Sequence, residues 1–136
     1  MIKAHEVASE WELELGEAQI TEAALSRALR IVITSEEADS LTVSIATPFT
    51  VTLAASSTIV HLDPERDDPK LGGLIVSLRG SGVEEISVLS NRTLRVICEV
   101  ASIEVPPDRD YEAWDLESES FKLVAVPGDE VAVWLR

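Results

Sequence analysis

Two neighbouring stretches, ALRIVIT at residues 28–34 and LTVSIA at residues 41–46, determine the fold that we predict for this chain. The first is rich in β-branched residues. The second places an apolar side chain at every other position, which is the pattern of a half-buried strand. The polar stretch SEEADS at residues 35–40 separates them. Strands joined by so short a connection favour antiparallel pairing, because parallel pairing needs a crossover of roughly a dozen residues or more.

The same period of two recurs along most of the chain and predicts further strands. It begins near residue 19, and after the break at Pro48 it returns in Phe49, Val51 and Leu53. Further strands are expected over residues 58–62, 85–90, 93–100, 102–105, 111–116, 121–126 and 130–135.

The N-terminal residues fit two structures. Trp11, Leu13 and Leu15 alternate with glutamates, which favours a strand. Apolar residues from Ala4 onward also recur at helical spacing, which favours a short helix over residues 4–10.

One helix is expected near residues 68–79. Asp67 or Asp68 can cap its N-terminus, and a glycine just beyond residue 79 can end it. The adjacent glycines at 72–73 weaken the prediction, because glycine disfavours a helix interior. Four apolar residues fall at the i, i+3, i+4 and i+7 positions of one helical face: Leu71, Leu74, Ile75 and Leu78.

The two halves of the chain resemble each other, over approximately residues 19–62 and 85–126. SRALRIVI at residues 26–33 aligns without a gap on NRTLRVIC at residues 91–98. Further on, Leu41 and Val43 match Ile103 and Val105, and IVHL at 59–62 matches LVAV at 123–126. We interpret this as the duplication of one β-meander, with chance similarity between apolar strands as the alternative.

We therefore predict a single domain over residues 1–136, of mainly β class at the border of α+β. Each meander would leave one apolar face that needs the other. The two related antiparallel meanders would form a sandwich or a partly open barrel, with the helix near residues 68–79 connecting them.

Composition excludes several classes of protein. With 46% hydrophobic residues and one cysteine, the chain is neither disordered nor a disulfide framework. Its net charge of −14 argues against nucleic-acid and anionic membrane partners, which both attract basic side chains. The first fifteen residues contain no signal-peptide core, and no apolar run is long enough to span a bilayer. We expect a cytoplasmic location.

No motif for catalysis, a cofactor or a metal is evident. His61 and Asp63 share one strand face, but a half-exposed strand histidine beside a turn aspartate is the simpler interpretation. Cys98 lies in an apolar strand and reads as a core residue. The chain lacks the glycine-rich phosphate loops. We therefore predict no catalytic residues, no metal and no cofactor, and favour a protein that is not an enzyme.

Two acidic segments are the candidate partner-binding residues. The first holds Asp63, Glu65, Asp67 and Asp68, whose spacing does not fit an EF-hand loop. A solvated loop before the helix is the simpler interpretation of this segment. The second holds Asp108, Asp110, Tyr111 and Glu112, with Tyr111 as the expected surface contact. Trp114 and Trp134 are expected in the core.

The last quarter of the chain contains VPPDRDYEAWDL at residues 105–116 and LVAVPGDEVAVW at residues 123–134. These stretches resemble the C-terminal signature of an uncharacterised bacterial domain family, chiefly actinobacterial, which reads V-P-P-D-x-x-Y-E-A-W-x-L and then L-V-x-x-P-G-x-E-x-A-V-W. Asp129 departs from it where the family more often has a second glycine. The resemblance implies a bacterial cytoplasmic setting. It supplies no catalytic residues, because the family has no assigned activity.

The sequence is compatible with three functions. The first is a non-catalytic module that binds a basic protein partner through long-range attraction, for example an immunity-like protein that neutralises a basic toxin. The second is a homo-oligomeric scaffold, such as a homodimer, that pairs through a sheet edge or the surface around Tyr111. The third is an enzyme or small-molecule binder with an acidic pocket, using magnesium.

Overall fold

The structure is a computed structural model that describes residues 1–128 and 130–136. Asp129, the expected departure from the signature that the last quarter of the chain resembles, lies outside the described residues. The described residues form strands and a helix in this order: β1 (Lys3–Val7), β2 (Glu10–Glu14), β3 (Ala18–Ser26), β4 (Ala28–Ser35), β5 (Ser40–Ile45), β6 (Phe49–Leu53), β7 (Ile59–Leu62), α1 (Pro69–Leu78), β8 (Val83–Val88), β9 (Leu94–Cys98), β10 (Ala101–Val105), β11 (Trp114–Glu117), β12 (Phe121–Ala125) and β13 (Val131–Leu135).

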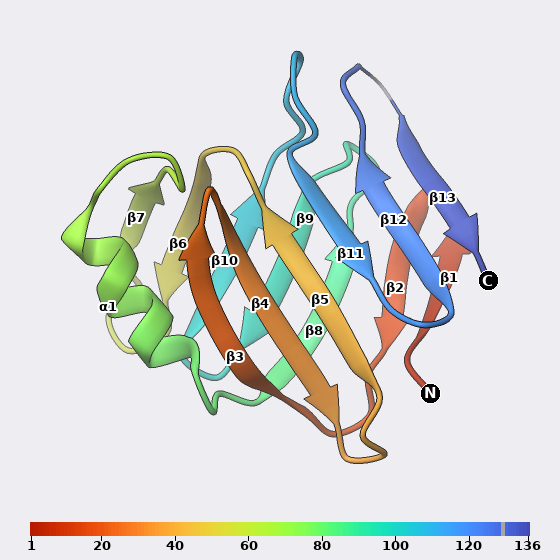
Figure 1. The fold of residues 1–136 in the computed structure, drawn as a ribbon, viewed down its shortest axis with the longest axis horizontal. Helices are drawn as coiled ribbons and strands as arrows, with labels where there is room; N and C mark the ends of the chain where they lie inside the picture. The colour runs from red at the N-terminus through yellow and green to blue at the C-terminus, as the bar shows by residue number, and fades with distance from the viewer. Residues whose placement is uncertain (129) are drawn as a thin grey trace.

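These strands form two antiparallel sheets that lie face to face (Figure 1). The first has the order β1-β2-β8-β9-β10-β6-β7, and the second has the order β13-β12-β11-β5-β4-β3. Both sheets have free edge strands, so the molecule is a sandwich and not a closed barrel. The predicted mainly β class is confirmed.

The core lies between the sheets and follows the predicted alternation. In β4 the side chains of Leu29, Ile31 and Ile33 are fully buried, while Arg30 between them is exposed. The largest buried side chains include Trp114, whose indole Nε1–H donates a hydrogen bond to the carbonyl oxygen of Arg92 at 3.1 Å. This bond satisfies the one polar atom of an otherwise apolar side chain.

The helix forms as predicted. The Asp68 side chain caps it by accepting a hydrogen bond from the backbone N–H of Lys70 at 2.9 Å. Leu71, Leu74 and Leu78 are buried. Gly80 follows the helix with a positive φ of 83°, a conformation that glycine adopts without strain. Each of the two internal glycines costs about 1 kcal/mol relative to alanine. Figure 1 shows α1 at one side of the sandwich, beside β6, β7 and β3.

Each sheet combines strands from both halves of the chain. Three consecutive strands, β8-β9-β10, are extended by the hairpin β6-β7, and in the other sheet β3-β4-β5 is extended by β11-β12. Arg27 and Arg92, aligned in the sequence, have nearly equal positive φ angles of 67° and 68°. Duplication of a meander stays a prediction, and these features support it.

The ladder registers give a different alignment of the third strands. Ile31 pairs with Val43, and Val96 pairs with Ile103. Because Ile31 aligns with Val96, the register sets Val43 against Ile103. The sequence comparison matched Val43 with Val105 instead, so the two alignments of this strand differ by two residues.

Of the two structures that fit the N-terminal residues, the strand is confirmed as β2 and the short helix at residues 4–10 is wrong. This segment forms β1, the turn and the start of β2, with Ala8 and Ser9 at positive φ angles of 53° and 66°. Two successive positive φ values are those of a tight hairpin turn, which is usually marked by asparagine or glycine. Pairing of β2 with β8 fixes this conformation through contacts distant in sequence.

Two expectations about aromatic residues also need correction. Tyr111 does not lie on a strand, because β11 begins at Trp114; its predicted surface position is nevertheless confirmed. Trp134 is not a core residue: its side chain is 50% exposed. It lies on β13, an edge strand, opposite Lys122 of β12, whereas Trp114 lies inside the sheet.

Candidate functional site

The two predicted acidic segments lie apart in the structure. Residues 63–68 form the connection from β7 to α1, and residues 106–113 form the connection from β10 to β11. Figure 1 shows the first beside the helix and the second projecting from the end of the sandwich. The fold therefore does not combine them into one site.

Three of the predicted carboxylates shape their own loops. Asp63 accepts a hydrogen bond from the backbone N–H of Glu65 at 3.0 Å and lies 3.6 Å from the guanidinium of Arg66. Asp68 caps α1. Asp108 accepts hydrogen bonds from the backbone N–H groups of residues 110 and 111. These are the local roles that aspartate commonly has in turns and caps.

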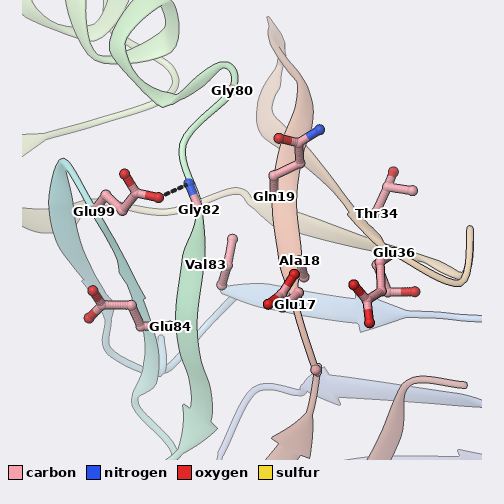
Figure 2. A pocket seen from close by; sticks show the side chains of 12 residues that line it. Glu17, Ala18, Gln19, Thr34, Glu36, Gly80, Gly82, Val83, Glu84 and Glu99 are labelled. Atoms are coloured by element: carbon pink, nitrogen blue, oxygen red, sulfur yellow. Dashed lines mark hydrogen bonds between the residues drawn. The ribbon is translucent and has the colours of Figure 1, made fainter.

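A different set of acidic residues surrounds an open pocket of about 630 Å³, drawn in Figure 2. It lies where β3 of one sheet approaches the start of β8 in the other. None of the twelve residues that line it is lysine, arginine or histidine. Four exposed glutamates are among these residues: Glu17, Glu36, Glu84 and Glu99. We call these four residues and the space between them the acidic pocket.

Hydrogen bonds from backbone N–H groups order each side of the acidic pocket. On one side, the N–H of Glu36 donates to the carbonyl oxygen of Glu17 at 2.9 Å. On the other, the N–H of Gly82 donates to Oε1 of Glu99 at 3.1 Å, and the N–H of Glu99 donates to the carbonyl oxygen of Gly82. A Cβ atom at position 82 would collide with the Glu99 carboxylate, the end of an exposed side chain that would have to move away, so glycine permits this contact.

The arrangement of the carboxylates determines what they can bind. Among the described residues, no three His, Cys, Asp or Glu side chains lie close enough to hold a metal ion together. Figure 2 shows Glu84 and Glu99 on the β8–β9 side, whereas Glu17 and Glu36 are on the β3–β4 side. Separated exposed carboxylates suit several cationic groups of one partner better than a single ion.

The other candidate groups are placed as the sequence suggested. Cys98 is buried, and its thiol lies 3.2 Å from the carbonyl oxygen of Ala101. His61 is exposed on β7, while the carboxylate of Asp63 contacts Arg66 and the backbone of Glu65.

One carboxylate on the outer face of the second sheet has a perturbed acidity. Burial raises the pKa of Asp115, which is half-buried between Ser44 and Val124 in the sheet. The negative charges of Glu117 and Glu112 act in the same direction, whereas the nearby Lys122 and a hydrogen bond with Ser44 oppose it. The folded protein therefore favours the protonated form of Asp115 more than the unfolded chain does.

Replacing Asp115 by asparagine is expected to stabilise the protein at neutral pH and to have less effect in acid. Because the folded pKa is raised, the ionised side chain destabilises the native state. The penalty is absent below the ordinary value of 3.8, grows as the pH rises from there to the folded pKa, and stays constant above it. Urea unfolding of both proteins at pH 3 and pH 7 measures this. The same stability difference at both pH values would contradict it.

In the part of the chain that the structure describes, no helix has the length and apolarity needed to cross a membrane. Fold and site together define a two-sheet antiparallel β-sandwich with an acidic pocket between the ends of its sheets. A family model matches residues 11–135, and the chain belongs to that family, a family of unknown function (DUF6188). Neither a curated protein nor a solved structure was found to match the chain.

Proposed function

We propose that this protein is a non-catalytic binding module that recognises a basic protein partner through the acidic pocket. The observation that carries the proposal is an open pocket lined by Glu17, Glu36, Glu84 and Glu99, without a basic side chain. The net charge of −14 adds a long-range field that attracts a cationic partner and speeds association. Because the four carboxylates lie apart from one another, they can pair with several lysine and arginine side chains on the surface of one partner.

The narrower form of the proposal is an immunity-like protein in the cytoplasm of a bacterium. Its partner would be a basic toxin such as a nuclease, whose nucleic-acid-binding surface must itself be cationic. Size, charge and the resemblance of the last quarter of the chain to a bacterial family support this form.

The test compares two variants with the same change in net charge. In the first, the four glutamates of the acidic pocket are replaced by glutamine. In the second, the changes are Glu65→Gln, Asp67→Asn, Asp110→Asn and Glu112→Gln, outside the pocket lining. A fluorescein-labelled polylysine peptide is the probe, and fluorescence anisotropy at low and high ionic strength measures binding.

The pocket variant is expected to bind the peptide about tenfold or more weakly, because each exposed charge pair contributes roughly 0.2–1 kcal/mol. The control variant should differ from the native protein by less than about threefold. Equal weakening by both variants would mean that net charge alone attracts the peptide, and the pocket assignment would be wrong. If the pocket variant alone weakens binding, capture of partners from the host lysate with the native protein and the pocket variant would identify the biological ligand.

A second function, self-association through β13, is favoured by a separate observation. Among the described residues β13 pairs on one side only, and VAVWL at residues 131–135 contains no charge. Val133, Trp134 and Leu135 are 39%, 50% and 75% exposed. Other edges carry features that discourage pairing: β1 is charged, β7 is short, and β3 has an irregularity between Ile20 and Glu22.

Self-association predicts a concentration-dependent dimer that Val133→Lys abolishes, because a lysine on an edge strand opposes pairing with another sheet. Sedimentation equilibrium measures the dimer, and Val76→Lys on the exposed face of α1 is the matched control. A native protein that stays monomeric at all concentrations would remove this function.

A further inference from the structure

A second pocket, of about 570 Å³, lies between α1 and the inner face of β6 and β7. In Figure 1 the helix runs beside these two strands at the side of the sandwich. We call this space the helix groove. Its volume falls within the range of small-molecule sites in proteins. Eight of its twelve lining residues have apolar side chains: Val51, Leu53, Ala55, Val60, Leu62, Leu74, Val100 and Ala101.

The walls of the helix groove continue the core. Val51, Leu62 and Leu74 are each at most 6% exposed, yet all three line the groove. Val51 pairs with Val60 across β6 and β7, so both side chains lie on the face that looks toward the helix. Protein interiors are normally filled to crystal-like density. An apolar space of this size beside the core is therefore suited to an apolar guest.

The glycines of α1 provide the second observation. Neither Gly72 nor Gly73 has a positive φ, and a Cβ atom at either position would meet nothing within 4 Å. Backbone conformation and packing therefore do not require glycine, which is among the least favourable residues inside a helix. Gly73 lines the helix groove and Gly72 does not. A side chain at position 73 would occupy the groove, so glycine there keeps it open.

One charged residue in the lining of the groove indicates the head group of a guest. Lys70 is the one charged residue of its lining. Within residues 1–128 and 130–136 no ion pair is formed by the Lys70 ammonium, although the chain carries a net charge of −14. The hydroxyl of Ser77 already donates to the carbonyl oxygen of Gly73 at 3.0 Å. A cation beside an apolar groove is complementary to a molecule with an aliphatic chain and one carboxylate.

We propose that the helix groove binds an aliphatic monocarboxylate, with its chain between α1 and β6–β7 and its carboxylate on the ammonium of Lys70. This site is separate from the acidic pocket, because the two linings share no residue. Binding of a basic protein and binding of an aliphatic carboxylate can thus be tested independently.

Isothermal titration calorimetry of the full chain with dodecanoate, below its micelle concentration, tests the proposal. The native protein should bind dodecanoate saturably at one site. Gly73→Leu should weaken binding at least tenfold, whereas the matched control Gly72→Leu should leave it within twofold. Lys70→Gln should weaken dodecanoate by up to about fivefold, as for one exposed charge pair, and dodecanol little, because the alcohol has the same chain without the charge. Dodecyltrimethylammonium, with the opposite charge, should bind more weakly than dodecanoate.

Several results would overturn the proposal. The native protein could fail to bind dodecanoate. Gly73→Leu and Gly72→Leu could weaken dodecanoate binding equally, or dodecyltrimethylammonium could bind more tightly than dodecanoate. Circular dichroism checks that both leucine variants fold. Where Gly73→Leu does not fold, methyl chemical shifts of the native protein replace it: dodecanoate should shift Val51, Val60 and Leu74, and shifts confined to other methyl groups would contradict the site.

Discussion

Replacing Trp114 by alanine is expected to lower the free energy of unfolding by about 3–5 kcal/mol, the usual cost of deleting a large buried aromatic side chain. Trp114 is 1% exposed, and its indole N–H satisfies the carbonyl oxygen of Arg92. The variant would lose the packing of the ring and the hydrogen bond that the indole N–H donates. Urea unfolding followed by circular dichroism measures the change.

The control for this prediction is Trp134→Ala. It removes the same side chain from a half-exposed position on β13, and we expect a loss of less than about 1 kcal/mol. Trp114→Phe keeps most of the buried area and should cost less than alanine, roughly the contribution of the hydrogen bond plus a small cavity. Equal losses for Trp114→Ala and Trp134→Ala would contradict the assignment of Trp114 to the core.

Replacing Leu78 by alanine is expected to cost about 2–5 kcal/mol. Leu78 is fully buried in the last turn of α1, and the residues just after it bond to β3, because the N–H of Gly80 donates to the carbonyl oxygen of Ile20. The cavity would therefore open where the helix joins the sandwich. Thermal and urea unfolding measure the loss.

Val76→Ala is the matched control for Leu78→Ala. Val76 lies on the same helix and is 69% exposed, so its truncation should change stability by less than about 0.5 kcal/mol. A small effect of Leu78→Ala would show that α1 contributes little to the core. That result would also count against the helix groove, because the groove needs α1 to be held firmly against the sandwich.

Local patterns were sufficient to predict most elements of this fold. The spacing of Leu71, Leu74 and Leu78 and the cap at Asp68 located α1 to within one residue at each end. The alternation in residues 28–34 and 41–46 located β4 and β5. Both signals arise from side chains that are near in sequence, which is why they can be read without the structure.

The errors come from features that depend on distant contacts. Nothing in the residues around Ala8 and Ser9 marks a tight turn, and the pairing of β2 with β8 decides their conformation. Trp134 has the same alternating neighbours as a core strand, but β13 is an edge strand. Whether a strand lies at the edge or the centre of a sheet is set by the strand order, which periodicity does not contain.

The acidic pocket could not be predicted for a related reason. Its four glutamates come from different parts of the chain, at residues 17, 36, 84 and 99, and none belongs to a motif. The densest acidic runs, by contrast, mark turns and a helix cap. Gly82, which has no side chain, is the residue that lets the Glu99 carboxylate approach.

The mixing of both halves in each sheet has a consequence for how the chain is made. When the ribosome is synthesising α1, the residues of β6 have been made but those of its neighbour β10 have not. In the same way, β5 is made before its neighbour β11. Each strand edge stays open to other chains until the second half has emerged. Contacts between such distant segments also slow folding. We therefore expect the chain to be most vulnerable to aggregation and proteases after its first half has been made and before the strands of the second half complete the two sheets.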